Sequence, residues 1–124
     1  MDAKDPADLH RLFADAFNAH DLDALLALYE PDAVLVPSAG QRVTGQDGLR
    51  QTLAGFLASF ETITLTTRGV VQGEDTALLY SEFQLTGPGT GGAPPQLEGR
   101  GTEVARRQDC GTWRFAIDDP FSTA

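Results

Sequence analysis

The pattern of apolar and polar residues divides the chain into a helical first half and a strand-rich second half. Between residues 5 and 19, apolar residues recur three and four positions apart, as along the buried face of an amphipathic helix. Asp5 followed by Pro6 is typical of a helix start. The apolar face of this helix comprises Leu9, Leu12, Phe13, Ala16 and Phe17. His10 is expected to be exposed.

Two further helices and a short strand are predicted before residue 61. Asp21 is suited to cap a second helix, which Pro31 ends, because proline cannot be accommodated in a helix interior. The apolar run at residues 33–36 predicts a short buried strand, and the segment 45–48 leads into a third helix. The predicted apolar positions of these two helices are Leu22, Leu25, Leu26 and Tyr29, and Leu49, Leu53, Phe56, Leu57 and Phe60.

From residue 62 the apolar period changes from 3.6 to 2, which indicates β-strands. Ile63, Leu65 and Thr67 alternate with other threonines, a composition typical of strands. The later predicted strands are residues 76–86, 98–108 and 112–118. Three helices segregated from a mostly antiparallel sheet indicate a single α+β domain over residues 1–124.

The segment 87–96 holds four glycines and three prolines, so we expect a flexible hairpin loop there. Its glycines satisfy G-x-G-x-x-G, but the dinucleotide-binding motif requires a helix to follow. Pro94, Pro95 and a predicted strand follow instead. Nucleotide binding is therefore not the favoured interpretation of this segment.

The last hairpin predicts that two acids face each other. If Cys110 and Gly111 form a two-residue turn, Glu103 pairs with Asp118, and directly paired side chains have Cβ atoms about 5 Å apart. Two carboxyl groups that close, when buried, tend to hold a proton and can act as acid and base. Alternation alone gives another interpretation, in which the face of Trp113 points into the core and Asp118 points to solvent.

Charge and composition exclude several classes of partner. Nine basic and eighteen acidic residues give a net charge of −9, which argues against nucleic acid or an anionic membrane surface. The single cysteine cannot form an internal disulfide, and it cannot complete a zinc site with only His10 and His20. His20 is interpreted as a turn residue before the cap Asp21. No metal or cofactor is expected, and without an apolar span or signal segment we expect a cytoplasmic location.

Several segments in this order resemble the SnoaL-like and ketosteroid-isomerase-like branches of the nuclear-transport-factor-2-like superfamily. The segments are FNAHDLDA (17–24), LYEPDAV (28–34), GQDGLR (45–50), EVARRQ (103–108), GTWRF (111–115) and IDDPF (117–121). The resemblance covers nearly the whole chain. It implies a cystatin-like curved antiparallel sheet, shaped as a cone, with three N-terminal helices packed on its concave face and a pocket between them.

The resemblance also implies a small-molecule ligand and a homodimer formed through the outer sheet face. In ketosteroid-isomerase-like enzymes an aspartate near the end of the first strand is the general base, and that position is Pro37 here. The tyrosine that donates to the oxyanion falls on Phe13, whereas the second donor, a protonated carboxylic acid, falls on Glu103. The same chemistry by the same residues is therefore not expected.

The resemblance places Glu103 and Asp118 toward the cavity, and both are the predicted catalytic residues. The predicted ligand-binding residues are Phe13, Phe17, Tyr29, Phe56, Phe60, Tyr80, Glu82 and Ala116. Three hypotheses remain open. The protein binds a small, mostly apolar metabolite, it is an acid–base isomerase, dehydratase or hydrolase, or it is a dimeric interaction module without a ligand.

Overall fold

The computed structural model describes residues 2–38, 40–87 and 96–121, which form three helices and six strands. In chain order these are α1 (Asp8–Asn18), α2 (Leu22–Leu26), β1 (Tyr29–Leu35), β2 (Val43–Thr44), α3 (Gln46–Ser59), β3 (Thr62–Gln72), β4 (Thr76–Thr86), β5 (Gln96–Arg107) and β6 (Trp113–Asp119). The strands form one sheet in the order β2-β1-β6-β5-β4-β3. Neighbouring strands are antiparallel except β1 and β6, which are parallel.

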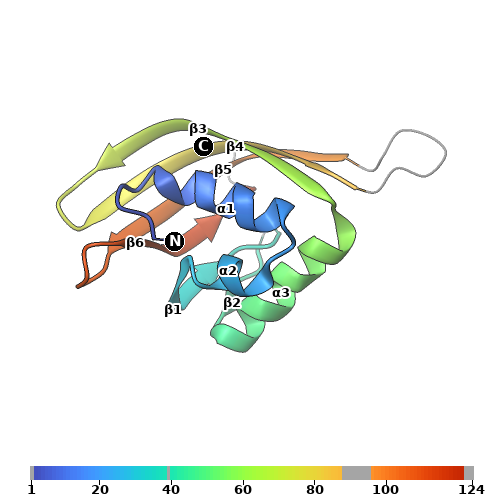
Figure 1. Cartoon of the computed structure of the whole chain (residues 1–124), viewed down its shortest axis with the longest axis horizontal. Helices are drawn as coiled ribbons and strands as arrows, with labels where there is room; N and C mark the ends of the chain where they lie inside the picture. The colour runs from blue at the N-terminus through green and yellow to red at the C-terminus, as the bar shows by residue number, and fades with distance from the viewer. Residues whose placement is uncertain (1, 39, 88–95, 122–124) are drawn as a thin grey trace.

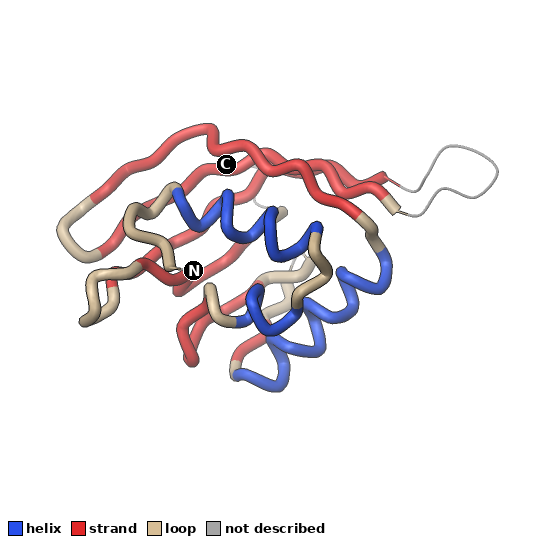
Figure 2. The backbone as a smooth tube through the Cα atoms, in the orientation of Figure 1, coloured by secondary structure: helices blue, strands red, loops and turns tan. Residues whose placement is uncertain are grey.

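The sheet is strongly curved, and the helices lie within its curve. In Figure 1 the long strands β3, β4 and β5 arch over α1, and α2 and α3 lie toward β1 and β2. Figure 2 shows the helices gathered on the concave side of the strands. The core lies between these layers, where Leu9, Phe17, Leu49, Leu79 and Phe115 are at most 2% exposed. The predicted α+β class, with helices on the concave face of a curved sheet, is confirmed.

The first two helices begin at different kinds of cap. α1 begins at Asp8 rather than at Asp5, because the preceding residues form a turn in which the N–H of Asp5 donates to Asp8 Oδ2 at 3.2 Å. The start of α2 agrees with the prediction, since Asp21 Oδ1 accepts from the N–H of Ala24 at 3.0 Å. A side-chain cap of this kind satisfies a backbone donor that the helix itself leaves unpaired.

Pro31 does not end a helix as predicted but lies inside β1. The pairing between β1 and β6 shifts register between Tyr29 and Val34, so proline, which lacks an N–H, occupies an irregular part of the ladder. The two-residue strand β2 was not predicted, and Phe60 lies just after α3 instead of within it. Of the predicted loop at residues 87–96, residues 88–95 lie outside the described residues, and Gln96 is the first residue of β5.

The final hairpin has a three-residue loop, residues 109–111, rather than the predicted two-residue turn. The N–H of Gln108 donates to the carbonyl of Thr112 at 2.7 Å, and the N–H of Gly111 donates to the carbonyl of Gln108 at 2.9 Å. Gly111 has a φ of 89°, a left-handed conformation that glycine adopts without strain. A type I turn followed by such a residue is a common three-residue hairpin loop. Compared with the predicted turn, this loop shifts the pairing of β5 with β6 at the hairpin end by one residue, so that Arg107 pairs with Trp113.

A β-bulge in β6 shifts the register back. Val104 pairs with Ile117 and Ala105 pairs with Phe115, so Ala116 is the extra residue. The two one-residue shifts cancel, and Glu103 pairs with Asp118 as the sequence predicted.

The bulge also decides between the two interpretations of the last strand. Before the bulge along the chain, Trp113 and Phe115 are buried. After the bulge, Asp118 is buried, at 8% exposure. Ile117 is 42% exposed, although alternation placed it in the core with Trp113. Each interpretation was therefore correct for one half of β6, since a bulge reverses which residues face inward.

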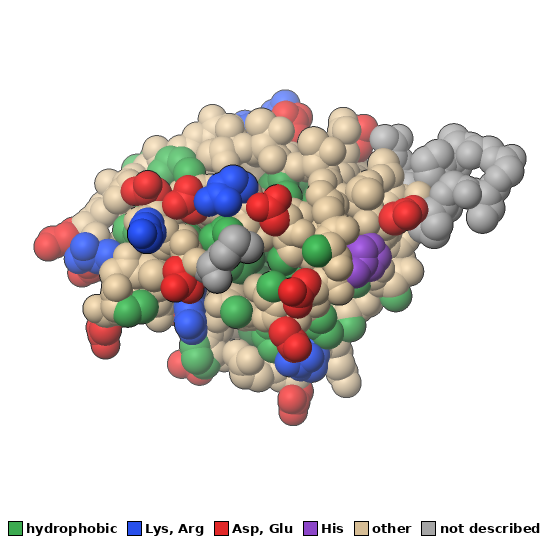
Figure 3. All heavy atoms as spheres, in the orientation of Figure 1, with side chains coloured by type: hydrophobic (Ala, Val, Ile, Leu, Met, Phe, Trp, Pro, Cys, Tyr) green, Lys and Arg blue, Asp and Glu red, His purple; other side chains and the backbone are tan. Residues whose placement is uncertain are grey.

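The surface carries charge of both signs without a basic patch on the face shown in Figure 3, where acidic side chains surround a few basic ones. This distribution agrees with the net charge of −9. Among the described residues, no helix is both long and apolar enough to cross a membrane.

Candidate functional site

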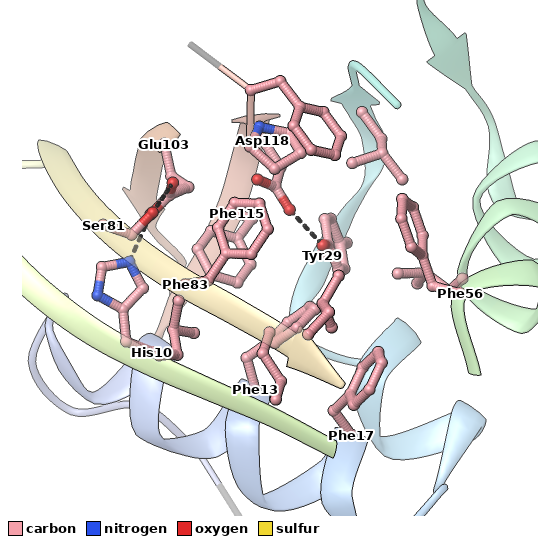
Figure 4. Close-up of a pocket in the computed structure, with 17 residues that line it drawn as sticks. His10, Phe13, Phe17, Tyr29, Phe56, Ser81, Phe83, Glu103, Phe115 and Asp118 are labelled. Atoms are coloured by element: carbon pink, nitrogen blue, oxygen red, sulfur yellow. Dashed lines mark hydrogen bonds and ion pairs between the residues drawn. The ribbon is translucent and has the colours of Figure 1, made fainter. Parts of the chain in front are cut away.

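A pocket lies between the sheet and the helices. Its cavity volume is about 70 Å³. Most of its wall is apolar, and the phenylalanines in it are Phe13, Phe17, Phe56, Phe83, Phe115 and Phe121. Five polar residues join this wall, namely His10, Tyr29, Ser81, Glu103 and Asp118. Figure 4 shows these polar side chains converging from α1, β1, β4, β5 and β6.

Glu103 is held by side chains from two other elements. Its carboxyl group is hydrogen-bonded through Oε1 to His10 Nε2, and Ser81 Oγ donates to Oε2 at 2.8 Å. Glu103 and His10 are each 3% exposed, and Ser81 is 2% exposed. Burying a carboxyl group is costly unless hydrogen bonds replace those of water, and these contacts supply that replacement. Both oxygens of Glu103 are thus already engaged.

Gly101 makes room for this carboxyl group. A Cβ at this position would lie 2.7 Å from Glu103 Oε2, 2.8 Å from Ser81 Oγ and 2.9 Å from the Cα of Pro120. Such distances are below those that real Cβ atoms show, so a larger residue would displace the side chains or the backbone. The glycine is required here for close approach and not for its backbone angles.

Among the described residues, one side chain is hydrogen-bonded to the carboxyl group of Asp118. Tyr29, which is 1% exposed, donates from its hydroxyl to Asp118 Oδ2 at 2.5 Å. Burial, and after it the negative charge of Asp118, raises the pKa of Tyr29 well above 10.0, so the hydroxyl keeps the proton that it donates.

The pKa of Asp118 is raised from 3.8 to about 7. The main cause is burial, and the second is the charge of Glu103 on the facing strand. The hydrogen bond from Tyr29 acts in the opposite direction, and Asp119 adds a smaller increase. A carboxyl group with this pKa is present in both protonated and ionised forms near neutral pH, as an acid–base group requires.

The structure brings together six of the ten predicted site residues. Both acids line the pocket, as do four of the aromatic residues, namely Phe13, Phe17, Tyr29 and Phe56. Phe60 is half-buried and stacks on Phe56 with ring centroids 6.5 Å apart, outside the pocket wall. Ala116 is buried at the bulge but does not line the pocket.

The placement of Tyr80 and Glu82 in the pocket was wrong. In β4 the residues that face inward are Ser81 and Phe83, so their neighbours project from the outer face of the sheet. Glu82 is exposed and lies 3.7 Å from Arg100 in an ion pair. The sequence left the register of this strand open because of the long loop that follows it.

Sequence reasoning missed His10 and Ser81. His10, predicted to be exposed, is buried because it lies one and two helical turns before Phe13 and Phe17, on the stripe of α1 that faces the pocket. That spacing could have identified it. Ser81 could have been found as the one hydroxyl in the inward series between Leu79 and Phe83. A polar residue among inward-facing apolar residues of a strand indicates a hydrogen-bond partner in the protein interior.

His20 has the structural role that the sequence predicted. Its φ is 54°, and its Nε2 is hydrogen-bonded to the carbonyl of Glu61 at 3.0 Å. Pro37 follows β1 and does not line the pocket, whereas Phe13 does. Within the described ranges, no group of three or more His, Cys, Asp or Glu side chains could hold a metal ion.

Solved structures share this fold at low sequence identity. A ketosteroid isomerase-like protein from Erwinia carotovora atroseptica is 22% identical, with 95% of this chain and 93% of that chain covered and a TM-score of 0.74. A proposed dehydratase of the NTF2-like family from Streptomyces avermitilis is 19% identical, with 95% and 94% covered and a TM-score of 0.73. A proposed calcium/calmodulin-dependent protein kinase type II association domain from Thiobacillus denitrificans is 18% identical, with 98% and 99% covered and a TM-score of 0.79. At these identities the likeness establishes the fold alone.

No curated protein is significantly similar in sequence to this chain. The family model described as "SnoaL-like domain" matches residues 9–116, which include every described helix and strand except the first residue of α1 and the end of β6. The chain therefore belongs to the SnoaL-like domain family.

Proposed function

We propose that this protein binds a small, mostly apolar molecule in its pocket and that Asp118, assisted by Glu103, exchanges a proton with that molecule. The observation that carries the proposal is a pair of buried acidic residues, at directly paired positions of neighbouring strands, in the wall of a mostly apolar pocket. The reaction class that follows is a proton transfer within one substrate, as in an isomerisation or a dehydration.

The pocket wall favours a ligand with a ring. Phenylalanines from α1, α3, β4 and β6 surround the cavity, and aromatic side chains pack well against planar apolar groups. The cavity of about 70 Å³ is smaller than an engineered cavity of about 150 Å³ that holds benzene, so a wall side chain must move to admit a ring. Phe13, Phe56 and Phe121 are only half-buried, so they can move at less cost than the buried phenylalanines of the wall.

Asp118 is the group that would meet the substrate. Tyr29 holds its Oδ2, which leaves Oδ1 to contact a ligand. In the ionised form, Oδ1 would take a proton from a carbon beside a carbonyl group. In the protonated form it would return that proton to another atom, so the carboxyl group ends each cycle as it began. A pKa of about 7 makes both halves of the cycle accessible near neutral pH.

Glu103 would act through Asp118. His10 and Ser81 already engage both of its oxygens, so it is not free to move toward a ligand. Its charge raises the pKa of Asp118 from the facing strand. Its proposed role is therefore to set the proton affinity of the aspartate.

Two neighbours in fold are consistent with this class. One is a proposed dehydratase and another is ketosteroid isomerase-like, and both reactions move a proton next to an oxygen-bearing carbon. The residues that would do the work here are argued from this chain's own pocket, because identities near 20% do not carry a mechanism.

A panel of small aryl and alicyclic ketones in D₂O tests the proposal. NMR would follow the loss of the protons next to each carbonyl group. We expect at least one ketone to exchange faster with the protein than in buffer, and the gain to disappear in Asp118→Asn. The matched control is Asp32→Asn, because Asp32 is exposed on β1. Equal exchange in Asp118→Asn and the unmodified protein would contradict the proposal.

The outer face of the sheet supports a second part of the proposal, a homodimer. Val71, Leu78, Val104 and Ile117 lie in direct register across four strands and form an apolar row. Val71 is 59% exposed and Ile117 is 42% exposed, and the other two are half-buried. A second copy that covers this row would remove its apolar surface from water.

Light scattering tests the dimer. We expect the unmodified protein to have twice the mass of the chain at micromolar concentration, and Ile117→Lys to be a monomer with an unchanged pocket. Gln51→Lys, at an exposed position of α3 away from the outer face of the sheet, adds the same charge and is the control. A monomeric unmodified protein would contradict this part. A stable dimer that binds none of the ketones would instead favour a non-catalytic interaction module.

A further inference from the structure

A chain of hydrogen bonds leads from the pocket to the surface through His10. Its Nε2 is bonded to Glu103 Oε1, and its Nδ1 lies 2.6 Å from Thr67 Oγ1. His10 itself is 3% exposed, whereas Thr67 is an exposed residue. A single imidazole therefore connects a buried carboxyl group to a hydroxyl group at the surface.

The position of Thr67 follows from the sheet order. β3 is the last strand of the sheet, so none of the described strands covers its outer edge. Thr67 pairs with Ser81, whose side chain faces the pocket, and it therefore projects toward the same side. The next residues of β3 depart from the regular register, which shifts between Thr67 and Gly69. Inward orientation and an edge position together place its hydroxyl group between His10 and solvent.

We propose that His10 relays protons between Glu103 and solvent by way of Thr67. A proton on Glu103 Oε1 passes to Nε2 while the proton on Nδ1 passes to Thr67 Oγ1, and the threonine hydroxyl releases its own proton to water. The number of protons on the imidazole is unchanged, and Glu103 becomes ionised. The reverse sequence returns a proton to Glu103. Histidine is suited to this role because its two nitrogens can accept and donate in turn.

The relay rests on the proposed function, because it would set the charge of Glu103, which is proposed to set the proton affinity of Asp118. An apolar ligand in the pocket would exclude water from the pocket-facing side of the two carboxyl groups. The His10 route leaves the pocket elsewhere, between α1 and β3. Figure 4 shows His10 and Phe56 on opposite sides of the pocket, so a ligand that enters beside Phe56 would leave the His10 route open.

The same contacts argue against a nucleophilic triad. Ser81 donates to Glu103 and not to His10, so the histidine is not positioned to take the proton of the Ser81 hydroxyl group. Both ring nitrogens of His10 are engaged by Glu103 and Thr67. His10 is therefore a positioning and relay residue that acts through Glu103.

The test measures how fast the ring N–H protons of His10 exchange with water, by NMR of the ligand-free protein labelled with ¹⁵N-histidine. The chain has only two histidines, and His20→Asn assigns their signals, since asparagine tolerates the positive φ at that position. The comparison is between Thr67→Val, which removes the hydroxyl group at nearly constant volume, and Thr67→Ser, which keeps it. His20, bonded to the carbonyl of Glu61, is the internal control.

We expect Thr67→Val to slow the exchange at His10 by about tenfold or more, because a buried ring must then wait for local opening. Thr67→Ser should keep the exchange rate of the unmodified protein, and His20 should be unchanged in both variants. Exchange at His10 that is equal or faster in Thr67→Val would overturn the relay, since a merely structural threonine would loosen the ring when lost. No ligand is used, so this outcome is independent of whether the pocket catalyses a reaction.

Discussion

The two carboxyl groups of the pocket occupy paired strand positions but have different surroundings. Glu103 is hydrogen-bonded through both carboxyl oxygens, to His10 and Ser81, whereas the carboxyl group of Asp118 accepts one hydrogen bond from the described residues, that of Tyr29. Both are buried. Hydrogen bonds, and not burial alone, therefore decide whether a buried carboxyl group can exchange a proton with a ligand. Glu103 is fixed in place, whereas Asp118 has one carboxyl oxygen that no described side chain engages, and its pKa is about 7.

The largest expected effect is on how stability depends on pH, and it comes from Asp118. Its pKa is about 7 in the folded protein against 3.8 when unperturbed, so between these values the folded state binds a proton that the unfolded state has lost. The aspartate's contribution to stability is fully present below about pH 4 and is lost as the pH rises to about 7. The loss is on the order of 4 kcal/mol.

Urea unfolding at several pH values checks this, with Asp118→Asn for comparison. The difference in stability between variant and unmodified protein should increase in favour of the variant from pH 4 to 7 and then level off. A difference that does not change with pH would contradict the raised pKa.

Gly101→Ala is expected to have the next largest effect, a loss of about 3 kcal/mol in the free energy of unfolding. The new Cβ would collide with the Glu103 carboxyl group and the backbone at Pro120. It would therefore disturb the contacts of Glu103 and leave the hydrogen bond between Tyr29 and Asp118 in place. Gly55→Ala is the control, because a Cβ there meets nothing within 4 Å inside α3. It should stabilise the helix by about 0.5–1 kcal/mol. Chemical denaturation measures the stability of both variants. Equal effects would show that the Glu103 carboxyl group does not need the space that Gly101 leaves.

His10→Leu is expected to cost about 2 kcal/mol, because it leaves a buried oxygen of Glu103 without its partner at nearly constant side-chain volume. Thermal and urea unfolding at neutral pH would measure the change. Arg11→Leu, at the next and exposed position of α1, is the control and should change stability by less than about 0.5 kcal/mol. A similar small effect in His10→Leu would mean that the histidine contact does not stabilise Glu103.

Tyr29→Phe is expected to have the smallest effect, about 1 kcal/mol, since it removes one hydrogen bond. It should also raise the pKa of Asp118 further, because that bond lowers it. NMR titration of the variant would show the shift. An unchanged titration of Asp118 would mean that the hydrogen bond from Tyr29 does not affect the pKa of this carboxyl group.

The fold was largely predictable from local pattern. β4 was predicted with its observed bounds, and the cap Asp21 was correct, because alternation and capping are properties of a few neighbouring residues. The pairing of Glu103 with Asp118 was also correct, although it rested on a wrong turn that the bulge at Ala116 compensated. Pairing errors of this kind are invisible in the sequence, since a bulge leaves no required residue type.

The site was predicted only in part, because its polar members come from separate elements. Glu103 and Asp118 could be joined through one hairpin, but the contact between His10 and Glu103 spans most of the chain. Tyr80 and Glu82 were assigned to the wrong face because the loop between β4 and β5 hides their register. Ser81 was overlooked for the same reason.

A ¹³C NMR titration of the Asp118 carboxyl group, in the unmodified protein and in Glu103→Gln, tests directly whether burial and the facing glutamate raise its pKa. We predict a midpoint near 7 in the unmodified protein and a lower midpoint in the variant, where the facing charge is gone but the burial remains. Glu82→Gln, which neutralises an exposed acid on the outer face, should leave the midpoint unchanged. A midpoint near the ordinary value of 3.8 in the unmodified protein would contradict the account.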